Sequence, residues 1–152
     1  MSADPVDMNN SRDWPKISFF HSIPFKNTDV RREIAGIAGD LGFPIQIRQI
    51  KIITFTEESV IKKLITGNHR HFGESGQWEI IIVLGSEFIE YINFRYRNFS
   101  SGIEEKKLVG GDVVIVPPGC SLALVPLIVN AQVIEISNQE YSNINYEIDE
   151  LF

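Results

Sequence analysis

The sequence predicts an all-β protein built as a sandwich or a barrel. After Pro44 the apolar residues recur with a period of two, which is typical of strands. The apolar segments are short and are separated by Gly, Pro, Asn or Ser, a spacing of turn signals found in sandwiches and barrels. At 152 residues the chain has the length of one ordinary domain.

Eight segments rich in Ile, Val, Phe and Tyr are the candidate strands. They are residues 45–55, 60–71, 77–84, 87–97, 105–109, 112–117, 120–126 and 131–137. The first 15 residues are polar and contain two prolines, so we expect a flexible N-terminal arm over 1–15 and a single domain over 16–152.

One N-terminal helix is expected ahead of the strands, over residues 29–41. Val30, Ile34 and Leu41 fall on one face at helical spacing, and Gly42 offers a left-handed end. Two glycines inside this segment each cost about 1 kcal/mol relative to alanine. The helix is therefore expected to depend on docking against the strands.

The run from Ile80 to Leu84 has no polar face. We expect this strand to be covered on both sides, by the interior on one side and by a helix or a partner on the other. A monomer rarely exposes an apolar patch of more than several hundred Å². A homodimer is therefore predicted.

Charge and composition exclude several classes of protein. The net charge of −6, with scattered Lys and Arg, argues against a nucleic-acid-binding surface. No segment approaches the roughly 18 apolar residues that a membrane helix needs, and no early apolar leader follows Met1. Cys120 is the one cysteine, and a free thiol suits a reducing compartment. We expect a cytoplasmic protein without a membrane partner.

Two motifs narrow the fold. Residues 67–71 read Gly-Asn-His-Arg-His, and residues 111–119 read Gly-Asp-Val-Val-Ile-Val-Pro-Pro-Gly. His69 and His71 are two apart, so on a strand they point to the same side, about 6.5–7 Å apart. The two prolines end a strand because neither can donate to a ladder, and the glycine after them permits a sharp turn.

These motifs resemble the two signatures of the cupin superfamily, which are a G-x-H-x-H strand followed by a hairpin glycine, and a later G-x5-P-x-G. The resemblance covers about residues 45–140. It implies a double-stranded β-helix, the cupin jelly-roll barrel, with His69 and His71 facing the interior.

The chain departs from the metal-binding cupins, which usually add a Glu and a third His to these two histidines. Leu122, Ala123 and Leu124 stand where the third His would fall, and Trp78 stands at the usual Glu position. By strand alternation Glu79 is expected to face the other side from Trp78. We therefore predict no metal.

Any metal that did bind would be held by His69 and His71 with Glu74 or Glu79. Two secure ligands are fewer than the three that a protein site normally needs.

A cupin with an HxH pair and no metal quartet resembles the thymidine-diphosphate-sugar 3,4-ketoisomerases and, more distantly, the 3,5-epimerases of 4-keto-6-deoxy sugars. Residues 67–71 look like the ketoisomerase G-x-H-A-H strand, and residues 43–48 are similar to a segment that precedes their third strand. Two features depart from that branch. The tyrosine expected after the arginine of residue 48 is missing, and residues 72–77 are not the usual lysine-bearing link.

The resemblance implies that His69 and His71 move a proton between the carbons that flank a ketone, without a cofactor. A neutral imidazole suits this task. Arg48, Tyr91 and Arg95 are the candidate ligand-binding donors to the enediolate. The implied partner is a nucleotide sugar, and the implied setting is carbohydrate biosynthesis.

Two alternatives stay open at this stage. One is a non-catalytic cupin that binds a small polar ligand or a sugar, which the missing tyrosine favours. The other is a metal-dependent cupin enzyme. Fold alone does not decide among them, because one barrel hosts many chemistries.

Overall fold

The computed structural model describes residues 16–20, 25–28, 33–36, 47–71, 76–99, 101–140 and 146–151. Within these ranges the strands are β1 Ser18–Phe20, β2 Phe25–Thr28, β3 Glu33–Gly36, β4 Gln49–Thr54, β5 Thr66–His71, β6 Glu79–Leu84, β7 Glu90–Arg97, β8 Glu104–Val109, β9 Val113–Val116, β10 Ser121–Pro126, β11 Gln132–Ser137 and β12 Tyr146–Ile148. The helix α1 spans Glu57–Ile61.

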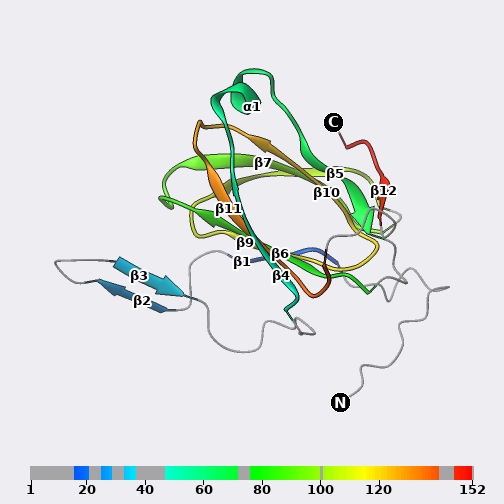
Figure 1. Cartoon of the computed structure of the whole chain (residues 1–152), viewed down its shortest axis with the longest axis horizontal. Coiled ribbons are helices and arrows are strands. Elements are labelled where there is room, and N and C mark those ends of the chain that lie inside the picture. The colour runs from blue at the N-terminus through cyan, green and yellow to red at the C-terminus, as the bar shows by residue number, and fades with distance from the viewer. Residues whose placement is uncertain are drawn as a thin grey trace, which may run out of the picture.

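The strands form two five-stranded antiparallel sheets that face each other (Figure 1). The first sheet has the order β1-β9-β6-β11-β4, and the second has the order β12-β5-β10-β7-β8. Strands distant in sequence are neighbours in both sheets, as a jelly roll requires. The predicted all-β cupin jelly roll is confirmed.

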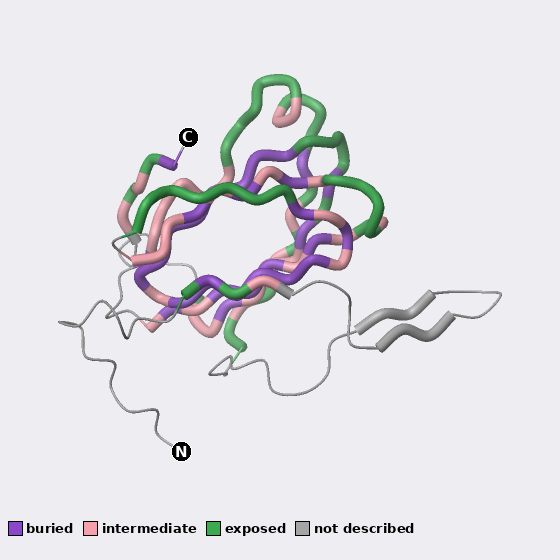
Figure 2. The backbone as a smooth tube through the Cα atoms, turned by 180° about the vertical axis from the view of Figure 1, so that it is seen from behind, coloured by how far each residue is buried: buried purple, intermediate pink, exposed green. Residues whose placement is uncertain are grey.

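The core lies between the two sheets because alternate residues of each strand point inward. In β7, for example, Ile92, Phe94 and Tyr96 are buried, whereas Arg95 between them is only partly buried. The tube in Figure 2 shows the same alternation of buried and more exposed residues along the facing strands. The largest buried aliphatic side chains of this core are Ile81, Ile92, Leu108, Leu124, Val83, Val114, Val116 and Val133.

The expected strands are found where the sequence placed them, with shorter bounds except for β8, which begins one residue earlier than expected. A second exception is the segment 60–71, whose beginning is helical. The helix α1 ends at Ile61, and Thr56 caps its start by accepting a hydrogen bond from the backbone N–H of Ser59 at 3.2 Å. None of the helices that the structure describes is long and apolar enough to cross a membrane.

The prediction of a helix over 29–41 is wrong. Residues 33–36 form strand β3, which pairs antiparallel with β2 as a separate two-stranded sheet. The helical spacing of a few apolar residues was a weak signal, because two glycines in the same segment oppose helix formation. The other residues of this segment, like the expected arm over 1–15, lie outside the described ranges.

A bulge at the start of β5 lies directly before its two histidines. The pairing of β5 with β10 shifts register between Leu122 and Ala123, opposite Gly67 and Asn68. Both bulge residues have positive φ, 91° for Gly67 and 63° for Asn68. A Cβ on Gly67 would lie 2.9 Å from the carbonyl oxygen of Leu122, so this position needs glycine for both conformation and space.

Replacing Gly67 with alanine should destabilise the fold by about 1–3 kcal/mol, because the new Cβ meets backbone and the positive φ disfavours an L side chain. Chemical denaturation measures the change. Gly102→Ala is the matched control, since its Cβ would meet nothing within 4 Å. We expect the control to change stability by less than about 0.5 kcal/mol. Equal effects of the two variants would contradict this account of the bulge.

Candidate functional site

A cavity of about 400 Å³ opens between the two sheets. Its polar walls come from strands of both sheets, and its apolar walls come from β4, β10 and β12. The lining residues are Lys51, Ile53, Thr66, Gly67, Asn68, His69, His71, Gln77, Glu79, Leu122, Leu124, Glu135 and Ile148. A concave site with a few convergent polar groups is the usual form of a small-molecule site.

His69 and His71 lie in this cavity on the same face of β5, as the sequence predicts. Their Nε2 atoms are 3.3 Å apart, and their rings meet edge to face with centroids 4.9 Å apart. The second motif holds the end of this strand, because the N–H of Gly119 donates to the carbonyl of His71 at 2.9 Å. His71 is only 6% exposed, whereas His69 is half-buried and more accessible.

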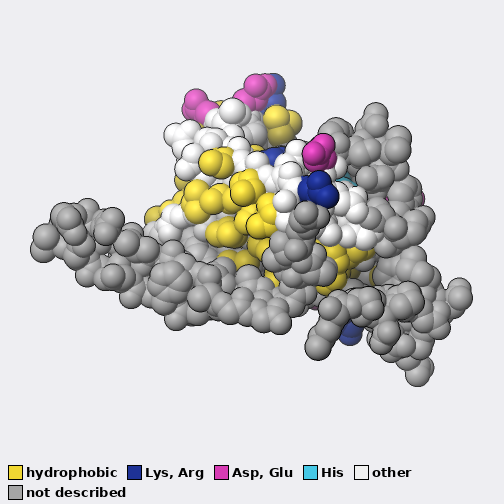
Figure 3. All heavy atoms as spheres, turned by 60° about the horizontal axis from the view of Figure 1, so that its bottom comes forward, with side chains coloured by type: hydrophobic (Ala, Val, Ile, Leu, Met, Phe, Trp, Pro, Cys, Tyr) yellow, Lys and Arg dark blue, Asp and Glu magenta, His cyan; other side chains and the backbone are white. Residues whose placement is uncertain are grey.

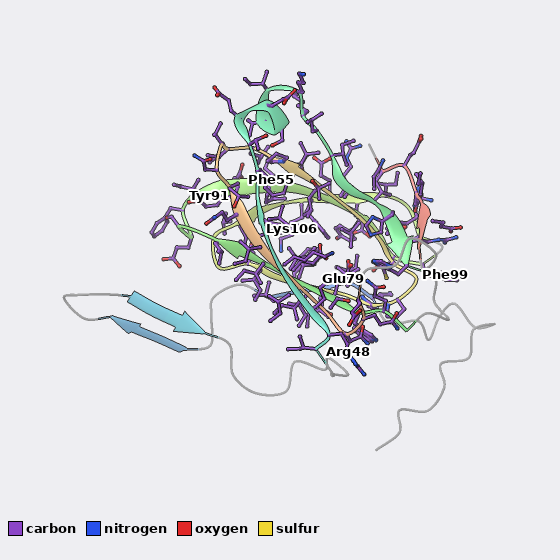
Figure 4. All side chains as sticks on the ribbon, viewed as in Figure 1. Arg48, Phe55, Glu79, Tyr91, Phe99 and Lys106 are labelled. Atoms are coloured by element: carbon purple, nitrogen blue, oxygen red, sulfur yellow. The ribbon has the colours of Figure 1, made fainter. Side chains whose placement is uncertain are left out.

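Glu79 also faces the cavity, on the opposite side of the strand from Trp78 as alternation predicts, so the error was to take the position of Trp78 as the inward one. Its Oε1 lies 2.9 Å from the Nε2 of His71, and the residue is 3% exposed (Figure 4). Trp78 points instead to the outer face, where it packs against Ile80 and its neighbours. Alternation in β6 explains this, because Glu79 shares its face with the core residue Ile81.

Gln77 also contacts this cluster. Its Nε2 lies 3.2 Å from the Nε2 of His71 and 3.4 Å from the Oε1 of Glu79. The second carboxylate oxygen of Glu79, Oε2, is buried and has no hydrogen-bond partner within the described part of the chain. A buried carboxylate oxygen without a donor is costly, so this oxygen can accept a hydrogen bond or bind a cation from a ligand.

The sequence analysis missed Lys51 and Glu135, which face the cavity from β4 and β11. Lys51 Nζ contacts Glu135 Oε1 at 2.5 Å, and the two residues are cross-strand partners. A signal was available, because each is a charged residue flanked by isoleucines in a half-buried strand. In a period-two strand with apolar residues on the outer face, the charged residue must face inward.

The buried carboxylate depends on the cationic groups around it. Burial raises the pKa of Glu79, but the hydrogen bond with His71 and the electrostatic effects of His71, His69 and Lys51 outweigh it, so the pKa is lowered overall. Glu79 is therefore ionised at neutral pH. By contrast, burial and then the nearby charge of Glu79 raise the pKa of Glu135, against the opposing effect of Lys51.

Burial also lowers the pKa of His69, with the proximity of His71 adding to the effect and the charge of Glu79 opposing it. His69 is therefore neutral at neutral pH and can accept a proton. Cys120 has no comparable role, because burial raises the pKa of its thiol to about 11.

The structure does not bring Arg48, Tyr91 or Arg95 to the cavity. Arg48 lies exposed before β4 and points away from the barrel (Figure 4). Tyr91 packs over the turn glycine Gly85, with its hydroxyl accepting from the N–H of Ser86 at 3.1 Å.

Arg95 faces outward, where it donates to Glu105 Oε2 at 2.5 Å and to the carbonyl of Leu151 at 2.8 Å. The sequence did not show which face of β7 is inward, and the structure gives that face to Ile92, Phe94 and Tyr96. Glu74, the other candidate metal ligand, lies outside the described residues.

Three electron-pair donors therefore converge on one point. The Nε2 atoms of His69 and His71 and a carboxylate oxygen of Glu79 all lie within 4.8 Å of one another. Three such atoms repel unless a proton or a cation lies among them. The cluster can thus store and release a proton, or it can hold a metal ion.

No protein-family model matches the chain, and no curated protein matches its sequence. Solved structures match it closely in fold. A mutant 3,4-ketoisomerase from Thermoanaerobacterium thermosaccharolyticum, in complex with TDP-4-keto-6-deoxyglucose, is 13% identical with a TM-score of 0.67, and the match covers 88% of this chain and 87% of that chain.

A 3,4-ketoisomerase from Helicobacter canadensis is 12% identical with a TM-score of 0.68, over 88% of this chain and 90% of that chain. A 3'-monoepimerase from Streptomyces bikiniensis, in complex with dTDP-quinovose, is 11% identical with a TM-score of 0.69, over 87% and 68% of the two chains. The chain therefore shares the cupin fold of sugar-nucleotide ketoisomerases and epimerases, as the resemblance of its motifs implied.

The lowered pKa of His69 predicts how stability depends on pH. A folded-state pKa below the ordinary value of about 6.5 means that the folded state binds fewer protons. The stability gained from neutral His69 is present above pH 6.5 and is lost as the pH falls through the folded-state pKa. Thermal unfolding between pH 7.5 and 5 should show the melting temperature of the wild type falling more steeply than that of His69→Gln.

Glu135 is present in both proteins, so the comparison with His69→Gln separates the effect of His69 from the titration of that acid. The raised pKa of Glu135 acts in the opposite direction in both proteins, and the lowered pKa of Glu79 places its titration below this window. Parallel curves for wild type and variant would contradict the shift assigned to His69.

Proposed function

We propose that this chain is an isomerase or epimerase that acts on a nucleotide-linked keto-deoxy sugar by proton transfer. The observation that supports it best is the His69–His71–Glu79 cluster, which lines a cavity large enough for a sugar ring. The proposal agrees with the solved structures of the same fold, which include ketoisomerases, one of them in complex with TDP-4-keto-6-deoxyglucose, and a 3'-monoepimerase in complex with dTDP-quinovose.

His69 is the residue proposed to take the proton from the carbon beside the ketone. It is neutral, and it is the more accessible of the two histidines. As the C–H bond breaks, its electron pair forms the C=C bond of an enediolate and the ketone oxygen gains the negative charge. The hydroxyl on that carbon passes its proton to the former ketone oxygen, and return of the proton from His69 to the former carbonyl carbon completes the isomerisation. Epimerisation instead requires a proton delivered to the opposite face of the original carbon by an acid on that side.

His71 and Glu79 stabilise the positive charge that His69 gains. The carboxylate of Glu79 holds His71 at 2.9 Å, and His71 in turn lies 3.3 Å from His69. A buried, ionised carboxylate at the end of this chain favours a proton on the imidazoles. Glu79 is thus a positioning and electrostatic residue, since His71 stands between it and His69.

The enediolate oxygen needs a hydrogen-bond donor, and the donors in the cavity differ from those expected from the sequence. Lys51 and Gln77 line the cavity, whereas the donors expected from the sequence lie elsewhere. The ammonium group of Lys51, which is contacted by Glu135, is a cation that a developing oxyanion can share.

Deuterium exchange tests the proposed chemistry. The wild type is incubated with TDP-4-keto-6-deoxyglucose in heavy water, and nuclear magnetic resonance follows deuterium entering the carbon beside the ketone. His69→Gln should slow exchange about 10²–10⁴-fold, the usual contribution of a general base. Arg95→Gln is the control, because this side chain faces away from the cavity and should leave exchange unchanged.

Glu79→Gln should lower kcat with little change in KM, because Glu79 supports the base and not the substrate. Wild-type exchange in His69→Gln would remove its role as base. If no protein exchanges deuterium while calorimetry still detects nucleotide-sugar binding, the chain is a non-catalytic sugar-binding cupin.

A metal-dependent enzyme is the second candidate, and one observation favours it. Two imidazole nitrogens and one carboxylate are a donor set that Zn²⁺, Fe²⁺ or Ni²⁺ accepts, and the count is three where the sequence analysis secured two. The buried Oε2 of Glu79, which lacks a partner among the described residues, also fits a cation. A bound ion would polarise a substrate carbonyl as a Lewis acid.

Metal content separates the two candidates. The proposed isomerase should carry substoichiometric transition metal, and a chelator should leave its melting temperature unchanged. Leu122 and Leu124 line the cavity and offer no further ligand. One ion per chain by elemental analysis, lost in His69→Gln together with a chelator-sensitive melting temperature, would instead support the metal enzyme, because a tight ligand stabilises the fold.

A further inference from the structure

Lys51 and Glu135 form a second charged pair in the cavity, on the sheet opposite His69. Lys51 lies on β4 and Glu135 on β11, which are neighbours in the first sheet, whereas β5 of the second sheet carries His69. All three residues line the cavity. Packed sheets lie about 10 Å apart, which is the space that a sugar ring needs. A ring bound between the two sheets therefore meets His69 on one face and Glu135 on the other.

The strand register turns this pair inward. Glu135 shares its face of β11 with the core residue Val133, and Ile136 beside it packs on the outer face. Figure 3 shows hydrophobic side chains gathered on that outer side of the molecule. Lys51 is the cross-strand partner of Glu135, and its Nζ contacts Glu135 Oε1 at 2.5 Å. The pair therefore belongs to the cavity and not to the outer surface.

Stability does not explain a charged pair at this place. The side chain of Glu135 is only 12% exposed, so its ionised form has lost most of its contact with water. Apolar residues of similar volume often stabilise a fold as well as a buried ion pair does, or better. Ile53 and Val133 occupy the same inward faces of β4 and β11, so apolar side chains fit this wall. The pair is better explained by what it does to a ligand.

Glu135 is suited to hold a proton and to release it. Burial and the nearby charge of Glu79 raise the pKa of its carboxyl, against the opposing effect of Lys51. Once the proton has left, the carboxylate lies beside the ammonium group of Lys51, which stabilises it. These are the properties of a general acid.

We infer that Glu135 is the catalytic acid that inverts the sugar, and that this chain is an epimerase. The inference rests on the proposed function. His69 takes the proton from the carbon beside the ketone, and the C–H electron pair becomes the C=C bond of the enediolate. The O–H of Glu135 then gives its proton to the opposite face of the same carbon. The C=C pair forms the new C–H bond, the C=O bond is restored, and Glu135 is left as a carboxylate paired with Lys51.

Before the next turnover His69 loses its proton to water, and Glu135 takes one from water. The hydrogen of the product therefore comes from the solvent. A ketoisomerase has no need of the second acid, because a single base can carry the proton between adjacent carbons along one face of the ring. The acid on the facing sheet is thus the feature that favours inversion over movement of the ketone.

The stereochemistry of the product in heavy water tests this inference. The wild type is incubated with TDP-4-keto-6-deoxyglucose, and nuclear magnetic resonance reads the configuration and the deuterium content of the carbons beside the ketone. We expect a product that is inverted at one of these carbons, carries deuterium there and keeps its ketone in place. Glu135→Gln should slow inversion about 10²–10⁴-fold. It should still exchange deuterium into sugar of unchanged configuration, because exchange needs His69 and not Glu135.

Glu105→Gln is the matched control. Glu105 forms an ion pair of the same 2.5 Å length with its cross-strand partner Arg95, but on the outer face of the second sheet. This variant should invert the sugar at the wild-type rate.

The outcomes separate this inference from the proposed function. A wild type that exchanges deuterium without inverting the carbon, whether or not the ketone moves, would overturn the role of Glu135 and leave proton transfer by His69 in place. Inversion by Glu135→Gln at the wild-type rate would also overturn it. No exchange in any of the proteins would remove the proposed function and this inference together. The wild-type stereochemistry is decisive even if Glu135→Gln does not fold.

Discussion

The burial of one ionised carboxylate is the constraint on which the site depends. Glu79 is 3% exposed, and a buried charge is tolerated only with partners. Those partners are two histidines, both carried by β5. The bulge at Gly67 and the hydrogen bond from Gly119 fix the position of this strand. Without a proton or a cation among them, these groups would repel. The two histidines that stabilise the buried carboxylate therefore also form a reactive centre with it.

The two faces of the first sheet are linked by register. In β4, β6 and β11 the polar residues Lys51, Glu79 and Glu135 point into the cavity, and the isoleucines between them point outward. A slip of one residue in any of these strands would exchange the two sets, placing isoleucine in the site and charge on the outer face. Both faces favour the same register, since one needs paired charges and the other needs a continuous apolar surface. The site and the apolar outer face of the first sheet therefore depend on the same strand register.

The strands and the histidine pair could be predicted because both depend on local periodicity. The position of Trp78 was taken as the inward one because the family usually has its Glu there, although the alternation of Glu79 with Ile81 and Val83 places Glu79 inward. The candidate ligand-binding residues Arg48, Tyr91 and Arg95 lie away from the cavity for another reason. Whether Arg95 or Phe94 faces inward is decided by the opposing sheet, which lies far away in sequence. The expected N-terminal helix relied on spacing and on an end signal at Gly42, and the two glycines inside the segment were the stronger evidence.

The C-terminal segment extends the same logic to the rim of the cavity. Strand β12 pairs with β5 beside both histidines, and Ile148 lines the cavity opposite His69 in register. Leu151 then anchors this segment, because its N–H donates to the side chain of Asn68 at 2.6 Å while the side chain itself is buried. Asn68 is a bulge residue with positive φ, so the segment is tied to the one irregular point of β5. The strand that carries the histidines is thus held on both edges, which keeps two imidazoles close together over a carboxylate.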